Sequence, residues 1–320
     1  MRAMSRCGAL GRKRAPPSAA GVSLLAAIPL LPADASAHGG DLGELWLTGP
    51  AWTSDPRVVI PLYLSAVLFL VGTLRLWRRA GHGRGVRRWQ VVCFWSGWTV
   101  LALALLSPLH WLGERLFTAH MIEHELLMAV AAPLLVLARP GSTMLWALPV
   151  RWRAPAGGIA RLPILGGMWR AVSAPLPATL LHALALWAWH MPGLYDLVLV
   201  NAFAHWLQHL SFLLSALLFW WALLRGPARI RGYGASFLYL FLTSLHTGLL
   251  GVLLTMSPRL WYPRQVAAAA EWGLTPLEDQ QLAGLVMWVP AGLVYAVAAL
   301  ALAGLWIRRS GPASGQAHAT

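Results

Sequence analysis

The sequence is poor in charged residues. Only 11% of its 320 residues are Asp, Glu, Lys or Arg, which is less than half of the roughly 25% found in soluble globular domains. A soluble protein of this size could not cover its surface with so few charges, and 58% of the residues are hydrophobic. The composition therefore excludes an ordinary soluble protein and predicts a chain whose solvent is lipid.

Cysteine is also scarce, with Cys7 and Cys93 as its two examples. Residues 1–37 have the basic, apolar and small-x-small order of a secretory signal peptide, and we expect cleavage after Ala37, with an uncleaved cytoplasmic start as the alternative. Cleavage would leave Cys93 alone, which excludes an intramolecular disulfide and a Cys-rich metal site. Soft-metal chemistry would then have to use His or Met.

Seven apolar stretches are long enough to cross the roughly 30 Å hydrocarbon core of a bilayer. They predict an all-α, polytopic membrane protein with seven transmembrane helices in a bundle. The stretches lie near residues 58–77, 89–109, 119–138, 173–191, 203–224, 236–256 and 280–306. The predicted organisation is a cleavable signal peptide (1–37), an external N-terminal segment (38–57), a transmembrane domain (58–307) and a cytoplasmic tail (308–320).

Acidic residues are outnumbered, 11 against 25 basic ones, and Lys13 is the one lysine. The arginines gather in alternate connections and after the last span, so the positive-inside rule makes these connections cytoplasmic. The mature N-terminus is then outside, the C-terminus inside, and the chain multi-pass in the inner (plasma) membrane. Residues 139–172, rich in Gly, Pro and Arg, are expected to be a connecting loop. Because topology accounts for the charge, we expect the lipid bilayer as a partner and no nucleic acid.

Histidine carries the functional signal, because ionisable groups inside spans are costly and mark functional sites. Two pairs, His120/His124 and His205/His209, open the third and fifth spans with i, i+4 spacing. This spacing puts both rings of a pair on one helix face. If the two helices are neighbours, four imidazoles meet below the outer surface.

Imidazole nitrogens suit borderline metals, with copper and zinc the leading candidates. Taken singly, each histidine is more often a packed or hydrogen-bonded residue than a ligand, so the prediction depends on the matching depth of the two pairs. We expect Glu123 and Asp279 to orient ligating imidazoles by accepting hydrogen bonds from the ring nitrogens that do not bind the metal. The metal ligands predicted from this spacing are His120, His124, His205 and His209.

Other classes of function stay open. His120-x-x-Glu123-His124 matches a zinc-protease pattern in which two histidines hold the metal and the glutamate activates water. Its further acidic ligand would have to be Asp196, Glu278 or Asp279, and so short a pattern has a high false-positive rate. A haem-binding electron carrier would need axial ligands from facing helices, and no haem is expected. Scaffolding without a metal is a third alternative.

The last span has an unusually polar start. Thr275, Pro276 and Glu278 have the order of a capped helix start, in which Thr275 is the N-cap. Capping explains Glu278, but it does not explain why Asp279, Gln280 and Gln281 also enter an apolar helix.

Four segments carry a resemblance to a known family. They are His120-Met121 through Leu135, Leu186 through Asp196, His205 through Trp221, and Pro276 through Pro290, which includes the distinctive Leu277-Glu278-Asp279-Gln280-Gln281-Leu282-Ala283-Gly284. Over residues 55–307 the chain resembles the polytopic CtaG family of cytochrome c oxidase assembly factors. The resemblance implies a non-enzymatic role in maturing a haem–copper terminal oxidase, with a link to copper supply or insertion. It implies the oxidase catalytic subunit as a partner, with periplasmic copper chaperones as further candidates. The histidines that match the family, and that it makes candidate metal ligands, are His120, His124, His205, His209, His190 and His246.

Overall fold

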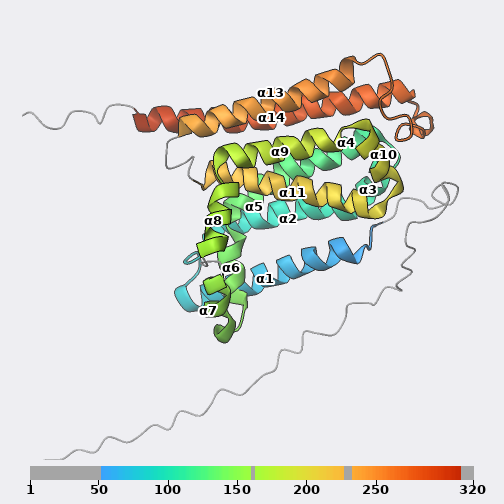
Figure 1. The fold of residues 1–320 in the computed structure, drawn as a ribbon. Helices are drawn as coiled ribbons and strands as arrows, with labels where there is room; N and C mark the ends of the chain where they lie inside the picture. Colours follow the sequence, from blue (N-terminus) through green and yellow to red (C-terminus); the bar gives the residue numbers. More distant parts are fainter. Residues whose placement is uncertain (1–51, 160–162, 227–232, 311–320) are drawn as a thin grey trace, which may run out of the picture. The chain divides into compact units, whose positions relative to one another are not determined.

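The computed structural model describes residues 52–159, 163–226 and 233–310 (Figure 1). These residues form helices and connecting turns, with no β-strand among them. The predicted signal peptide, most of the predicted external segment and residues 311–320 of the predicted tail lie outside the described residues.

Within the described part of the chain, six helices are long and apolar enough to cross a membrane. They lie close to six of the seven predicted stretches and make the chain an all-α, multi-pass membrane protein. They are α1 (Pro56–Ala80), α2 (Arg88–Leu106), a composite third span (Phe117–Ala138), α11 (Ala202–Leu224), α13 (Tyr233–Met256) and α14 (Pro276–Ser310).

The helix found at the fourth predicted span is shorter than the other spanning helices. It corresponds to α9 (Pro175–Trp189), whose 15 residues rise only about 22 Å at 1.5 Å per residue. The preceding helix α8 (Pro163–Val172) meets α9 at a bend of 67°. The count therefore reaches seven spans only if this bent pair is taken as one.

The expectation that residues 139–172 form a loop is wrong. This connection contains α6 (Pro140–Ala147), α7 (Val150–Ile159) and α8. Proline, taken as a loop signal, here occupies the start of α6, where its missing N–H costs nothing. Helix α6 packs closely on α1, since a Cβ built on Gly72 would clash with the carbonyl oxygen of Thr143.

The third span changes its winding halfway along. It consists of α4 (Phe117–Glu125), the π-helix η1 (Leu126–Ala131) and α5 (Ala132–Ala138). It is the most buried of the six long spans, and it packs against α2, α11 and α14. Short π-helical turns inside α-helices are frequent at functional sites.

The core lies where this span meets α11 and α14. Trp220 of α11 stacks on Tyr295 of α14 with 5.7 Å between ring centroids, and its indole N–H donates to the carbonyl oxygen of Met128 at 2.9 Å. Large apolar side chains are exposed on the outer faces of the spans, as lipid solvent requires. Examples are Leu64, Leu70, Leu180, Leu245, Leu293 and Leu300.

Candidate metal centre

Histidines from three helices come together between α4 and α11. Helix α4 supplies His120 and His124, α11 supplies His205 and His209, and the short helix α3 (Pro108–Gly113) adds His110. The closest backbone contacts of α11 with the third span are along η1 and α5, so the histidine side chains fill the space beside α4. Ring centroids are 4.2 Å apart for His120–His124, 4.6 Å for His205–His209, 5.1 Å for His124–His209, 5.2 Å for His110–His205 and 5.6 Å for His120–His205.

Three of these imidazoles form a buried set that we call the inner triad: His120, His124 and His209. One ring nitrogen from each lies within 4.8 Å of the others, and the residues are only 2%, 1% and 7% exposed. Nε2 of His120, Nε2 of His209 and both ring nitrogens of His124 have no hydrogen-bond partner. A buried polar group without a partner costs roughly 1–3 kcal/mol, whereas a metal ion accepts such nitrogens as ligands. The residues present therefore fit a copper or zinc ion.

A second set lies next to the inner triad and shares His209. Ring nitrogens of His110, His205 and His209 also lie within 4.8 Å of one another. His110 has a competing partner, because its Nδ1 lies 2.7 Å from Oε1 of Glu123. Burial acts to lower the pKa of His110, but the charge of Glu123 and its hydrogen bond outweigh burial, and this pKa rises to about 9. At neutral pH His110 is therefore a counter-ion for Glu123, and the inner triad is the better ligand set.

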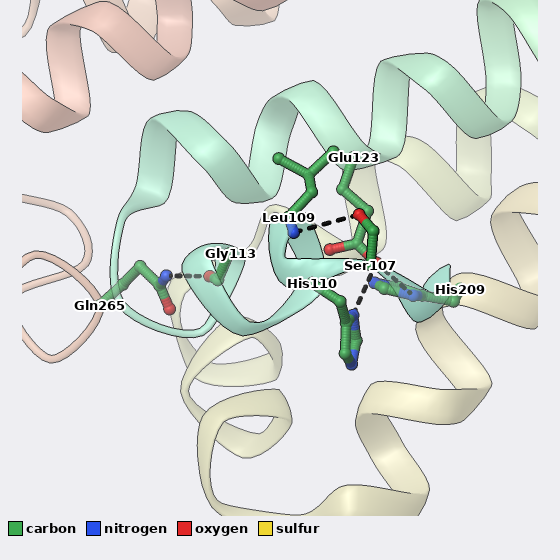
Figure 2. A network of polar contacts seen from close by, with 7 residues as sticks. All are labelled: Ser107, Leu109, His110, Gly113, Glu123, His209 and Gln265. Carbon is green, nitrogen blue, oxygen red and sulfur yellow. Dashed lines mark hydrogen bonds and ion pairs between the residues drawn. The ribbon is translucent and has the colours of Figure 1, made fainter. Parts of the chain in front are cut away.

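Glu123 orients the histidines around it. Its carboxylate is fully buried, and Oε1 faces Nδ1 of His110 at 2.7 Å and Nδ1 of His209 at 3.4 Å (Figure 2). A proton on Nδ1 of His209 directed at the carboxylate leaves the lone pair on Nε2, the nitrogen that lacks a partner. Carboxylates hold metal-ligating histidines in this way in many proteins.

Helix α3 supports this carboxylate closely. Gly113 leaves no room for a side chain, since a Cβ there would lie 3.0 Å from Oε2 of Glu123 and 3.3 Å from Cα of His120. The side-chain amide of Gln265 donates to the carbonyl oxygen of Gly113 at 2.8 Å, and the hydroxyl of Ser107 caps the start of α3 (Figure 2).

Asp279 has a different role from the one expected of it. It does not contact an imidazole. Its carboxylate accepts hydrogen bonds from the backbone N–H groups of Phe117 and Thr118 at 2.8 and 3.0 Å, and from the Thr118 hydroxyl at 2.7 Å. Asp279 thus caps α4 from α14, where an anion suits the exposed N–H groups of a helix start. It positions His120 by holding the helix.

The neighbours of Asp279 anchor the same region. Glu278 closes the expected capping box, accepting from the backbone N–H of Thr275 at 2.7 Å. Gln280 accepts from the backbone N–H of Trp261 at 2.6 Å and donates to the carbonyl oxygen of Arg259 at 3.0 Å. The polar start of α14 therefore ties together α4, α14 and the connection that follows α13.

Two predicted ligands lie outside both sets. Nδ1 of His190 donates to the carbonyl oxygen of Leu186 at 2.7 Å, which leaves its buried Nε2 with a lone pair and no partner. The hydroxyl of Tyr262 donates to the His190 carbonyl oxygen at 2.6 Å. His246 on α13 accepts from the indole N–H of Trp187 at 3.4 Å. Nε2 of His190 therefore remains available as a ligand, whereas His246 contacts Trp187 outside both histidine sets.

Sequence reasoning missed two residues here. His110 directly follows the second apolar stretch but has no histidine four residues away, so the spacing does not mark it as a ligand. Glu125 directly follows His124, and its Oε2 is buried without a hydrogen-bond partner. Its signal was present in the sequence as a carboxylate within an apolar span.

Two of the three carboxylates available to the zinc-protease pattern are engaged elsewhere. Asp279 caps α4, and Glu278 caps α14 at an exposed position. Asp196 belongs to neither of the candidate metal groups found among the described residues. The geometry around His120 and His124 is thus a histidine site with a buried orienting carboxylate.

Similarity to known proteins identifies the family of this chain. Relatives named as uncharacterized proteins in Mycobacterium bovis, Mycobacterium tuberculosis and Mycobacterium leprae are each 25% identical over 81% of this chain. The chain spans only about two fifths of the length of these relatives. No solved structure matches the chain. The model of the cytochrome c oxidase caa3 assembly factor family (Caa3_CtaG) matches residues 67–309. The chain therefore belongs to this family of oxidase assembly factors.

Proposed function

We propose that this protein assists assembly of a haem–copper terminal oxidase by holding a copper ion at His120, His124 and His209 and passing it to the oxidase catalytic subunit. The family membership supports the assembly role. The observation that carries the copper role is the inner triad itself: three buried imidazoles from two helices, with four ring nitrogens that have no hydrogen-bond partner.

In this proposal the surrounding residues have different roles in copper binding and transfer. Glu123 orients His209, and His110 balances the charge of Glu123. His205 lies beside His209 and is half-buried, so it offers a first ligand to copper that arrives from the outer side, for example from a periplasmic chaperone. His190, whose Nε2 carries the lone pair, serves as a relay ligand during transfer. A three-nitrogen site leaves coordination positions open for the ligands of the acceptor.

We propose copper rather than zinc because the haem–copper client requires copper, and imidazole nitrogens suit both metals. The ligand set contains no thioether. Met191 and Met256 are 60% and 65% exposed and are not enclosed with the histidines. A site of neutral imidazoles holds copper without the permanence of a thiolate site, which suits an ion that must be released. In this proposal the protein lies in the inner membrane with its mature N-terminus outside and performs no catalysis.

The test is metal analysis of the purified protein after copper loading, in the wild type and in the quadruple variant H120A/H124A/H205A/H209A. The matched control is His182→Ala, because His182 is equally buried but lies outside both candidate sets. We expect the wild type and the control to retain about one copper per chain and the quadruple variant to retain none.

Oxidase copper content in cells is the second readout. It should fall in cells carrying the quadruple variant and stay normal in cells carrying His182→Ala. Normal oxidase copper in the quadruple strain would replace the delivery proposal with metal-free scaffolding. Bound zinc together with hydrolytic activity that is lost in Glu123→Gln would instead favour a protease.

A further inference from the structure

A cavity of about 760 Å³ opens among the arginine-rich connections. Its arginines are Arg84 and Arg87 between α1 and α2, Arg139 between α5 and α6, and Arg225 after α11. Its apolar wall includes Leu224 of α11 and Leu302 of α14. One cavity thus combines guanidinium groups with the side chains of membrane-spanning helices, and its volume is in the range of small-molecule sites.

No carboxylate lines this cavity among the described residues. The sequence contains no Asp or Glu in residues 56–113, 126–195, 197–270 or 280–320, and every residue that lines the cavity falls within these ranges. Arg84, Arg87 and Arg139 make no ion pair within the described part of the chain. An anion from outside the protein would balance their charge.

The backbone holds two of these arginines in defined places. Gly83 and Gly85 have φ values of 78° and 77°, which turn the connection around Arg84. Arg139 itself has φ 57° and ψ 51°, a left-handed conformation that is unfavourable for a residue other than glycine. The conformation places the Arg139 side chain at the junction of α5 and α6, on the cavity wall.

We infer that this cavity binds the headgroup and first acyl segment of an anionic phospholipid. Guanidinium groups recognise phosphate oxygens through paired hydrogen bonds, and basic pockets between membrane helices bind acidic lipid headgroups. The leucine wall suits an acyl chain. Because no His, Met, Cys or Tyr lines the cavity, it offers no axial ligand to haem. This site is separate from the histidine centre, and the inference does not depend on the copper proposal.

The test compares two double variants that remove the same charge. R84Q/R139G removes two cavity arginines, and glycine suits the left-handed backbone at position 139, so the fold is preserved. R151Q/R170Q is the control, since both arginines lie in the connection between α5 and α9, are exposed and do not line the cavity.

Each protein is placed in nanodiscs of phosphatidylcholine with and without phosphatidylglycerol, and the lipid retained after mild detergent extraction is measured by native mass spectrometry. We expect the wild type and the control to retain phosphatidylglycerol at least tenfold over phosphatidylcholine, and R84Q/R139G to lose this preference. An equal loss in both variants would show general surface attraction and overturn the inference. Displacement of the lipid by millimolar inorganic phosphate would overturn it in favour of a free-anion site.

Discussion

The carboxylate of Asp279 accepts the backbone N–H of Phe117 at 2.8 Å across 162 positions of sequence. This bond joins the start of the last span to the first turn of the helix that carries His120 and His124. The distinctive segment that begins at Leu277 therefore fixes the start of α4 and does not supply metal ligands.

Removing this cap should loosen the site from a distance. Asp279→Ala deletes a helix cap and leaves the buried N–H of Phe117 and the half-buried N–H of Thr118 without acceptors, so we expect the free energy of unfolding to fall by about 1–2 kcal/mol. Thermal unfolding in detergent measures this loss. Asp279→Asn keeps one acceptor oxygen, so its free energy of unfolding should lie between those of the wild type and Asp279→Ala. Unchanged unfolding temperatures in both variants would contradict the capping role.

Glu123→Gln should weaken metal binding without abolishing it. The amide oxygen can still accept from His209, but the negative charge that makes the ring a better ligand is lost. Replacing a residue that orients a metal ligand typically costs 10–100-fold in affinity. Competition against a chromophoric copper chelator measures the change. If the affinity of Glu123→Gln equals that of the wild type, Glu123 does not orient the site.

Gly113→Ala should disturb the same carboxylate by contact. The added methyl group would press on Oε2 of Glu123 and on the backbone of His120, and we expect copper affinity to fall while the protein still folds. Gly193→Ala in α10 (Pro192–Val200) is the control, because nothing lies within 4 Å of a Cβ at that position. Similar copper affinity in the two variants would refute the close fit.

The contact between α13 and α14 should be equally sensitive to size. A Cβ on Gly284 would lie 2.6 Å from the carbonyl oxygen of Gly251, and small residues allow membrane helices to approach this closely. Gly284→Leu should destabilise the protein by about 1–3 kcal/mol in thermal unfolding. Gly292→Leu on the same helix meets open space and should be near neutral. Equal stability of the two variants would argue against close packing.

His246→Ala should leave copper stoichiometry unchanged. His246 contacts Trp187 and lies outside both candidate metal groups, although its family resemblance made it a candidate ligand. Metal analysis beside His124→Ala provides the comparison, since the latter should lose copper. Loss of copper in His246→Ala would return this residue to the ligand set.

The spans could be predicted well from the sequence because the thickness of the bilayer requires an apolar segment of about 20 residues. It failed for residues 139–172, where proline and glycine suggested a loop and short helices form instead. The i, i+4 spacing placed His120 beside His124, since that relation is internal to one helix. The positions of Asp279 and His110 depend on which helices pack together, and neither periodicity nor charge bias carries that information.

The π-helical turn η1 has a consequence for the register of the third span. Each wide turn contains more residues than an α-helical turn, so the outer half of the span is rotated relative to the inner half. If the six residues Leu126–Ala131 wound as an ordinary α-helix, the extra residue would rotate His120 and His124 by about 100° around the helix axis relative to α5. Deleting one residue together with the wide turn would instead cancel that rotation and leave the histidines on their present face. The direction in which they point therefore depends on the winding of a segment that contains none of them.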